Sequence, residues 1–211
     1  MAVSQLTNFT VPLAGGASAT SQGLLMPKLK YKFRLSFLNF GVSTNNVIEL
    51  TKQVMDVKRP SVQFGDIVID VYNSKVKLAG KHEWQDITVN LRDDVGGNVS
   101  KMVGEQLQKQ LDFQEQASAT SGIDYKFSMQ LEMLDGGNGA RTPTVLEQWN
   151  LYGCYLSQVD YGDVNYGSGT DPVTIALTVK YDNAEQTPQG GQTAGVGFGA
   201  TIAQTIGAIT G

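Results

Sequence analysis

The chain has 211 residues and a formal net charge of −4, from 16 Lys and Arg against 20 Asp and Glu. This mildly acidic balance excludes the broad cationic surface of a protein that grips a nucleic-acid backbone along its whole length. The single cysteine, Cys154, excludes an intrachain disulfide and is compatible with a reducing cytoplasm, and the single histidine, His82, leaves little for metal or triad chemistry.

Charged residues are confined to the middle of the chain, because every Asp, Glu, Lys and Arg lies between Lys28 and Glu185. With 41% hydrophobic residues the chain can build a core. We therefore expect one folded domain over 28–185, an uncharged N-terminal arm over 1–27, and an uncharged, glycine-rich tail over 186–211.

Neither uncharged end has the pattern of a targeting or membrane segment. The N-terminus lacks a basic region followed by an apolar run and a small-residue cleavage site, so secretion by that route is not expected. The apolar stretch 196–209 is interrupted by glycines and is shorter than the roughly 20 residues of a spanning helix. We expect no membrane insertion.

The domain opens on a run of alternating apolar and basic residues, a period of two that predicts a strand with one buried face. The apolar positions are Leu29, Tyr31, Phe33, Leu35 and Phe37. The positions between them hold Lys28, Lys30, Lys32 and Arg34, here called the cationic stripe. The alternation places the cationic stripe on one outer face, where it is either a docking surface for an acidic partner or a solvated face that discourages edge-to-edge aggregation.

Two strand-like runs follow, 67–72 and 75–78, and Asn73-Ser74 between them predicts a long hairpin with a tight turn. Further strands are predicted at 87–91, 125–133, 149–156 and 173–181 from the same alternation. One segment breaks the period: apolar residues three and four apart, after Asn98 as the N-cap, predict an amphipathic helix over 99–116.

The order of strands, one helix and more strands defines the expected fold class. We expect a mainly β protein with one α-helix: a small antiparallel β-barrel or two packed sheets, with a flanking amphipathic helix and a long hairpin. A helix of this kind serves as a cover or plug for the strands, which is not the arrangement of a doubly wound sheet.

Candidate catalytic and metal-binding residues are few. His82 stands at the entrance to a predicted strand with no nucleophile elbow in the sequence. The run Asp135–Gly139 lacks the terminal Glu of a calcium loop, and the acidic pairs at 93–94 and 160–163 are expected to be solvated. We expect no enzyme activity, no cofactor and no metal.

The order of these elements resembles the tail tube proteins of contractile-tailed bacteriophages, a family related in fold to type VI secretion and bacteriocin tube proteins. The resemblance rests on three segments: the opening strand at 27–40; the hairpin from Arg59-Pro60 to Ala79-Gly80 with the strand at 84–93; and the Trp-containing strand at 146–154 followed by 160–162 and 173–183. It spans most of 27–184, and no single motif in it is diagnostic.

Membership of that family would imply a structural virion protein without catalytic residues. Its subunits would form hexameric rings that stack into a tube inside a contractile sheath, as the conduit for genome ejection. The implied partners are further copies of the chain, the tail sheath protein, baseplate and tail-terminator proteins, and a tape-measure protein in the lumen. Genomic DNA would pass through without specific binding. The implied location is the virion tail, assembled in the host cytoplasm.

The long hairpin is the candidate element for reaching a neighbouring subunit, because its apolar faces exceed what a small barrel needs; the alternative is an internal barrel hairpin. The predicted interface residues are Phe64, Ile67, Ile69, Val71, Tyr72, Asn73, Val76 and Leu78. Fixed cations in the lumen would trap phosphates, so the cationic stripe is expected at the sheath side or between subunits. The uncharged arm and tail could order between stacked rings.

Two alternatives to a phage tail tube stay open. One is a tube protein of a contractile secretion or bacteriocin machine, which resembles the phage tube in fold. The other is a monomeric β-barrel that binds carbohydrate or peptide, with Trp84 and Trp149 as platforms.

Overall fold

The computed structural model describes residues 27–42, 47–136 and 143–188, so the uncharged arm and most of the uncharged tail lie outside the described residues. The chain divides into two units, 1–32 and 33–211. Of the first unit only 27–32 is described. There the Lys32 N–H donates a hydrogen bond to the Leu29 carbonyl oxygen at 3.2 Å, and the Lys32 ammonium lies over the Tyr31 ring.

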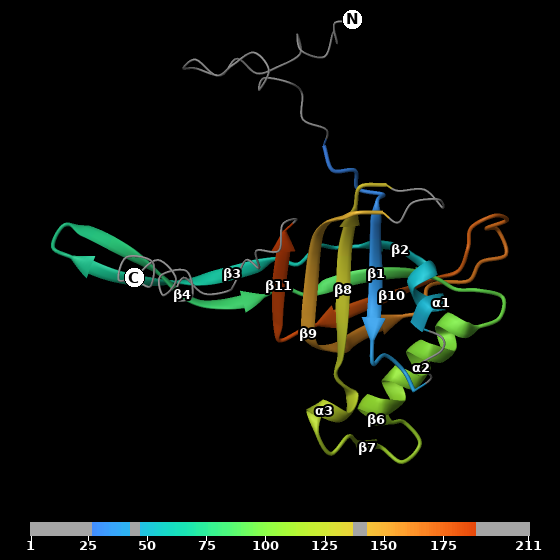
Figure 1. Ribbon diagram of the computed structural model, residues 1–211. Coiled ribbons are helices and arrows are strands. Elements are labelled where there is room, and N and C mark those ends of the chain that lie inside the picture. Colours follow the sequence, from blue (N-terminus) through green and yellow to red (C-terminus); the bar gives the residue numbers. More distant parts are fainter. Residues whose placement is uncertain (1–26, 43–46, 137–142, 189–211) are drawn as a thin grey trace, which may run out of the picture. The chain divides into compact units, whose positions relative to one another are not determined.

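The second unit contains three helices and eleven strands in its described part (Figure 1). In chain order these are β1 (Phe33–Leu38), α1 (Val47–Lys52), β2 (Val54–Val57), β3 (Val62–Val71), β4 (Ser74–Trp84), β5 (Ile87–Arg92), α2 (Asn98–Gln110), β6 (Leu111–Asp112), β7 (Ala117–Ser118), α3 (Gly122–Tyr125), β8 (Phe127–Leu134), β9 (Val145–Asp160), β10 (Thr174–Lys180) and β11 (Asn183–Pro188).

Seven of the strands form one antiparallel sheet in the order β1-β8-β9-β10-β5-β2, and β11 also pairs with β9. The 16-residue strand β9 belongs to both halves of this sheet. Its first part pairs with β8 and β11, and its last part pairs with β10. We call β1, β8, β11 and the first part of β9 the front sheet, and β10, β5, β2 and the last part of β9 the back sheet.

Strand β9 passes from the front sheet to the back sheet at Gly153. The backbone there has φ 68°, a left-handed conformation that favours glycine, and a Cβ atom would overlap the Asp182 carboxylate. On the neighbouring strands the break falls between β10 and β11, where the Asp182 N–H donates to the Tyr152 carbonyl oxygen at 3.0 Å. The bend in β9 and the break between β10 and β11 therefore lie side by side, and the sheet folds back on itself there.

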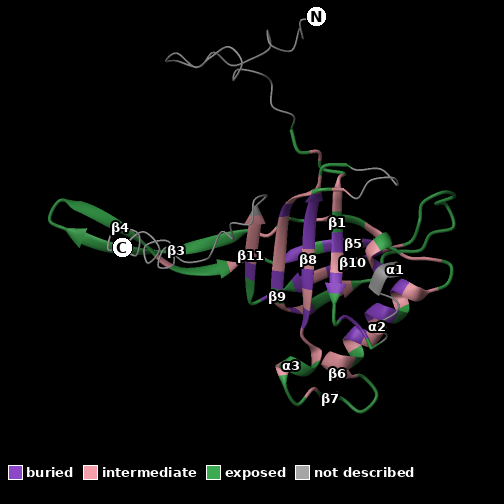
Figure 2. Cartoon of the chain, in the orientation of Figure 1, coloured by how far each residue is buried: buried purple, intermediate pink, exposed green. Residues whose placement is uncertain are grey.

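The core lies between the two sheets and under helix α2 (Figure 2). Alternate residues of the strands point into it, including Leu35, Leu131, Val89 and Leu177. Helix α2 adds a buried stripe of Val99, Met102, Val103 and Gln106. At one end, the rings of Phe37, Phe40 and Phe127 pack with centroids 4.9–6.4 Å apart.

The predicted fold class is confirmed: the protein is mainly β with antiparallel sheets, one amphipathic helix and a long hairpin. The predicted strands at 87–91 and 173–181 match β5 and β10 closely, and the predicted strand at 149–156 lies inside the longer β9. The helices α1 and α3 and the strands β2 and β11 were not predicted. Four of the six residues of strand β11 are polar, and the strand continues through Pro188, three residues into the stretch assigned to the tail.

The prediction for the opening strand is wrong in its first half. Strand β1 begins at Phe33, which pairs with Met133 near the end of β8. The described residues before it form no strand, and the Lys32 N–H donates back to the Leu29 carbonyl oxygen in a turn. Tyr31 is 74% exposed and does not point into a core. The alternation at 28–32 is therefore not strand alternation.

The predicted start of the helix is also wrong. Gly97 is the N-cap, with φ 65°, and Asn98 is the first helical residue. Asp94 satisfies the helix start, because its carboxylate accepts hydrogen bonds from the Asn98 backbone at 2.8 Å and from the Asn98 side chain at 2.7 Å. The Asn98 side-chain bond is the main cause that lowers the pKa of Asp94.

The helix ends six residues earlier than predicted, at Gln110. Asp112 explains this end, because its carboxylate accepts the backbone N–H groups of Gln114 and Glu115 and so forms a turn that competes with the helix. The chain then forms the short hairpin of β6 and β7.

Candidate assembly surfaces

The hairpin of β3 and β4, here called the arm, is exposed along almost its whole length. Figure 1 shows it extending beyond β11, and Figure 2 shows no buried residue on it. The two strands pair with each other and with no other described strand. The alternative of an internal barrel hairpin is therefore wrong, because the residues that would fill a barrel lie in solvent.

The register of the arm separates its side chains into two different faces. Residues directly opposite each other on an antiparallel pair share a face. The pairs Ile67–Leu78 and Ile69–Val76, with Val71 next to them, make one face largely aliphatic, and Ser74 opposite Val71 ends it at the turn. These five side chains are each 45–50% exposed. We call this surface the aliphatic face of the arm.

The opposite face of the arm carries charge. Val68 lies opposite Lys77 there, and Asp70 lies opposite Lys75, whose ammonium is 3.4 Å from the Asp70 carboxylate. A monomer gains nothing from the contrast between the two faces, because neither covers a core. The contrast is typical of a surface that is covered by another molecule.

The turn of the arm lies one residue earlier than predicted. Val71 pairs with Ser74, so Tyr72 and Asn73 form the two-residue loop, with Tyr72 at φ 46°. The Tyr72 side chain is fully exposed at the tip. Ala79-Gly80, which ends the hairpin segment of the sequence resemblance, lies inside β4 at a bulge. A Cβ atom at Gly80 would lie only 2.9 Å from the Gly65 carbonyl oxygen, so the two strands approach closely there.

Below the bulge, aromatic rings join the arm to the rest of the unit. Four rings follow one another in contact, with neighbouring centroids 5.7–6.2 Å apart. In order they are Phe64, His82, Trp84 and Tyr181. His82 is thus an exposed strand residue between two rings. Trp84 packs against the core from its edge, as Trp149 does, so neither indole is a free platform for a ligand.

Glu147 anchors the start of the arm and was missed by the sequence analysis. Its carboxylate is 4% exposed and accepts hydrogen bonds from Trp149 Nε1 at 2.7 Å and Gln186 Nε2 at 2.8 Å. The guanidinium of Arg59, just before β3, lies 3.7 Å away. No signal in the sequence marked it, because a glutamate in a strand is usually exposed.

The front sheet has an open edge on each side. In the described part of the chain, β1 pairs only with β8, and β11 pairs only with β9. Each of the two edge strands has six residues. The β11 edge does not stand out in the sequence, because polar residues fill most of that strand.

The structure does not bring the cationic stripe together on one strand face. Only Arg34 lies in β1, where its guanidinium is 2.6 Å from the Glu132 carboxylate. Lys28, Lys30 and Lys32 belong to the other unit. The strand alternation that defined the stripe is absent at these three positions, which is why the prediction of a single face is wrong.

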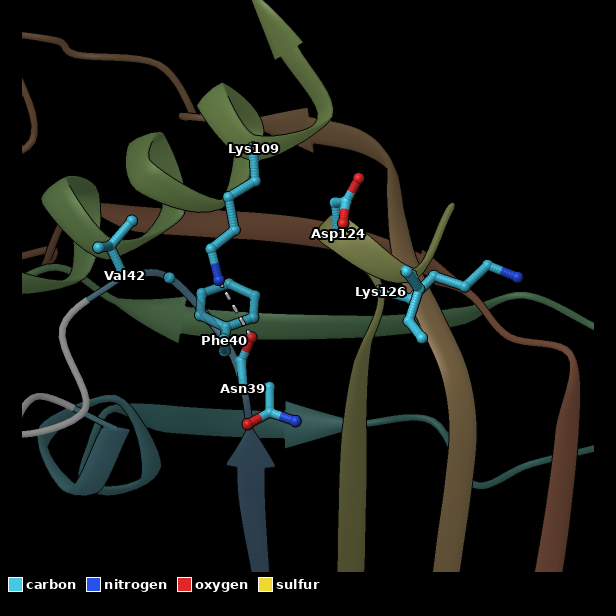
Figure 3. Close-up of a pocket in the computed structure, with 8 residues that line it drawn as sticks. Asn39, Phe40, Val42, Lys109, Asp124 and Lys126 are labelled. Carbon is cyan, nitrogen blue, oxygen red and sulfur yellow. Dashed lines mark hydrogen bonds between the residues drawn. The ribbon is translucent and has the colours of Figure 1, made fainter. Parts of the chain in front are cut away.

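The described pockets offer no arrangement for catalysis. One, of about 310 Å³, lies among the end of β1, α2 and α3 (Figure 3). Two lysines on its wall have partners: Lys109 donates to the Asn39 carbonyl oxygen at 3.5 Å, and Lys126 pairs with Asp182. A second, of about 340 Å³, lies beside the root of the arm, at His82 and Trp84.

The acidic residues considered in the sequence have local roles. Asp94 caps α2, and the Asp160 carboxylate accepts the Gly162 N–H at 2.9 Å in the loop after β9. The described residues include no group of three or more His, Cys, Asp or Glu side chains placed to hold a metal ion. None of the described helices is long and apolar enough to cross a membrane.

Solved structures with a similar fold come from contractile injection systems. A chain of the sheath–tube complex of the PVC extracellular contractile injection system, in its extended state, matches with a TM-score of 0.57 at 14% identity, over 82% of this chain and 99% of that one. A chain of the tube-terminating cap of the anti-feeding prophage matches with a TM-score of 0.56 at 14% identity, over 79% and 94%.

The PVC sheath/tube terminator, also in its extended state, gives a TM-score of 0.56 at 14% identity, over 78% of this chain and 99% of that one. No protein-family model matches the chain, and no curated protein matches it significantly. At these identities the likeness concerns the fold. The chain has the fold of tube components of contractile injection systems, and the fold implied by the sequence resemblance is thereby confirmed.

Proposed function

We propose that this chain is a structural protein, the tube subunit of a contractile tail, whose copies form rings that stack into a hollow conduit. The observation that carries the proposal is the aliphatic face of the arm: five aliphatic side chains on one side of a hairpin that the rest of the chain leaves in solvent. The shared fold with components of contractile injection systems supports it.

Covering the aliphatic face would supply much of the energy of assembly. Fully burying one such side chain contributes about 1.5–3 kcal/mol, and about half of each is still exposed. The five together therefore offer on the order of 5 kcal/mol per arm, before the costs of association. We infer that the arm packs on a neighbouring subunit through the aliphatic face, with Phe64, Tyr72 and Asn73 at the margins of that contact.

The open edges of the front sheet supply a second contact, one that closes a ring. Its strands alternate in direction, so β1 and β11 run in opposite directions. A rotation about an axis roughly along the strands would place β1 of one copy beside β11 of the next in antiparallel order. Such a heterologous contact closes when the rotation completes a circle, whereas ring-on-ring contacts continue as a filament.

The finer assignments follow the sequence resemblance. We propose that the rings are hexameric and that a contractile sheath surrounds the tube. Baseplate and terminator proteins would bound it, and a tape-measure protein would fill its lumen during assembly. Lys28, Lys30 and Lys32 remain candidates for a sheath or inter-subunit contact. In this proposal the tube lies in a virion tail and serves genome ejection.

A tube of a contractile injection machine is the second candidate, and the solved structures of similar fold favour it. Purified particles from a producing cell distinguish the two. Tails joined to genome-filled capsids would support the phage assignment. Headless contractile particles that contain this chain would support the injection machine.

Assembly is tested by expressing the full chain alone and combining light scattering after gel filtration with negative-stain electron microscopy. We expect ring-sized oligomers or hollow tubes. A matched pair of variants tests the arm: Ile69→Asn alters the aliphatic face, and Val68→Asn alters the opposite face at a similarly exposed position. Only Ile69→Asn should reduce assembly. A wild-type chain that stays monomeric at high concentration, even with baseplate complexes added, would contradict the proposal.

A further inference from the structure

The outer surface of the front sheet carries two rows of polar side chains that run across all four strands. The first row is Arg34, Glu132, Gln148 and Thr187, and the second is Ser36, Gln130, Asn150 and Glu185. Their neighbours along each strand point into the core, so these rows face outward. We call this surface the amide face, because amides and hydroxyls predominate on it.

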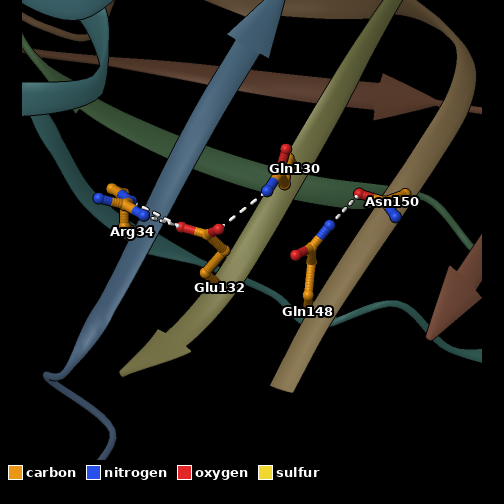
Figure 4. A network of polar contacts seen from close by, with 5 residues as sticks. All are labelled: Arg34, Gln130, Glu132, Gln148 and Asn150. Carbon is orange, nitrogen blue, oxygen red and sulfur yellow. Dashed lines mark hydrogen bonds and ion pairs between the residues drawn. The ribbon is translucent and has the colours of Figure 1, made fainter. Parts of the chain in front are cut away.

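The side chains of the amide face bind one another (Figure 4). Gln148 Nε2 donates to Asn150 Oδ1 at 2.9 Å along β9, and Gln130 Nε2 donates to Glu132 Oε1 at 2.8 Å along β8. Glu132 also accepts from Arg34 Nε at 2.6 Å. Both oxygens of the Glu132 carboxylate are therefore occupied.

The burial of Glu132 is unusual for an outward position. The residue is 5% exposed, although a carboxylate is seldom buried unless it is paired. Here the carboxylate lies between Arg34 and Gln130. Its Oε2 atom contacts two nitrogens of the Arg34 guanidinium, Nε and Nη2, each at 2.6 Å. Arg34 is the one basic residue at the outward positions of β1, β8, β11 and the first part of β9. The Arg34 side chain is itself 47% exposed, so its charge is balanced by the buried Glu132 carboxylate and not by burial of the guanidinium.

The outer surface of the back sheet differs in this respect. Its outward positions include Arg92 and Lys180, which are exposed as Arg34 is. The difference lies in the partner: the Lys180 ammonium is 3.8 Å from the Asp86 carboxylate, whose side chain is 45% exposed, whereas Arg34 is 2.6 Å from the buried Glu132 carboxylate. An exposed ion pair of that length is weak and leaves the cation available to other anions. The two surfaces of the unit therefore offer very different sites to a phosphate.

We propose that the amide face lines the channel of the tube, and that Glu132 is the residue that keeps this wall free of a cation available to a passing polyanion. The inference rests on the proposed function, because a channel exists only if copies assemble. If β1 pairs with β11 of the next copy, the two rows continue from subunit to subunit, and every position around the wall repeats the same neutralised pair.

The occupant that this wall fits is a nucleic acid. Each phosphate held by a fixed cation adds a salt-dependent increment to affinity, and one free arginine per subunit would repeat that increment around each ring. Self-bonded amides offer a phosphate no charge, the charges of Arg34 and Glu132 balance each other, and Glu185 repels a phosphate weakly. A protein cargo would gain nothing from the neutralisation of Arg34, which favours nucleic acid.

The test uses assembled tubes of the full chain and fluorescent single-stranded DNA, as linear molecules and as covalently closed circles of the same sequence. Glu132→Gln keeps the shape of the side chain but frees the charge of Arg34. We expect Glu132→Gln tubes to retain linear DNA about tenfold or more tightly than wild type at 50 mM salt, with retention that falls as salt rises. Circles have no end to thread into a channel, so we expect no gain for them.

Three further variants serve as controls. The double variant Arg34→Gln, Glu132→Gln removes the freed cation and should return retention to the wild-type level. Asp70→Asn frees Lys75 on the arm, an exposed pair at 3.4 Å away from the amide face, and should not produce retention that depends on DNA ends. Ser36→Lys adds a cation to the same face without altering the buried carboxylate, in case Glu132→Gln tubes do not form.

The outcomes separate the two proposals. Tubes of Glu132→Gln and Ser36→Lys that retain no linear DNA, or that retain circles equally well, would overturn the placement of the amide face while leaving the tube function standing. A wild-type chain that never assembles would overturn the tube function and this inference with it. Retention of linear DNA alone by both variants supports both.

Discussion

The body of the protein and its arm use the same strand alternation with opposite results. In β10 the alternate residues Ile175, Leu177 and Val179 are buried by the rest of the chain. In β3 the alternate residues Ile67, Ile69 and Val71 are about half exposed. The pattern alone predicts which residues share a face, and only the tertiary structure reveals whether the same molecule covers that face.

The buried residues of the body stabilise the folded chain, whereas the exposed aliphatic residues of the arm are available to bind a partner. Substitutions in the body should change the free energy of unfolding, and substitutions on the arm should change association. The first three experiments pair one site of each kind, or one constrained site with an unconstrained one, so that a failure of the distinction is visible.

The largest effect is expected from shortening a leucine. Leu177→Ala leaves a cavity at a residue that is 0% exposed and should lower the free energy of unfolding by about 3 kcal/mol. Thermal denaturation should then show a midpoint roughly 6–12 °C lower. Leu78→Ala, at 49% exposed, should shift the midpoint little but reduce assembly. Equal losses of stability would mean that the arm is folded into the body.

A glycine pair tests the bend that joins the two sheets. Gly153→Ala adds a Cβ atom at positive φ against the Asp182 carboxylate and should cost about 2 kcal/mol in urea denaturation. Gly104→Ala, in α2 with no atom near the new Cβ, should be neutral or stabilise by up to about 1 kcal/mol. If both variants unfold at the wild-type urea concentration, Gly153 does not determine the bend.

A glutamine pair tests buried polar contacts. Gln106 is fully buried in α2, where its amide donates to the Tyr125 carbonyl oxygen at 2.6 Å and accepts the Gly41 N–H at 3.0 Å. Gln106→Leu leaves both groups unpaired and should cost roughly 1–2 kcal/mol. Gln63→Leu, on the exposed arm, should leave the unfolding midpoint unchanged and, by adding an apolar side chain there, increase association.

The smallest effect concerns Cys154 at alkaline pH. Burial raises the pKa of this thiol from 9.0 to about 12, so the folded chain keeps its proton where the unfolded chain loses it. Stability should therefore fall as pH rises from about 9 towards 12, and less steeply in Cys154→Ala. At pH 8 the folded chain should resist a thiol reagent that labels the urea-unfolded chain at once. Rapid labelling of the folded chain would show that the core opens there.

The strands that build the body were predictable because burial by the same chain enforces their alternation. The residues of β5 and β10 are examples. Boundaries were less predictable where side chains compete with the backbone: Asp112 ends α2 early, and Asp94, not Asn98, satisfies the start of that helix. Strand β11 escaped prediction because it lies at an edge and buries only Ala184 among its burial-assigned residues.

The candidate surfaces show the same division. The arm was predictable from its aliphatic residues, since their number exceeds the need of the core. The structure of the cationic stripe was not predictable. Lys alternates with apolar residues at 28–32 as it would in a strand, but strand pairing begins only at Phe33. Glu147 and Glu132 could be recognised only after burial was known, since a glutamate in a strand is otherwise an ordinary exposed residue.

The bulge at Gly65 and Gly80 has a consequence for how such an arm can change in length. Beyond it, the pairs from Asp66–Ala79 to Val71–Ser74 span roughly 20 Å, and these segments pair with no other described strand. Adding two residues to each strand would lengthen the reach by about 7 Å and keep the aliphatic residues on their side, whereas adding one would turn them over. The length of the arm can therefore change by two residues per strand at a time, without any change to the rest of the protein.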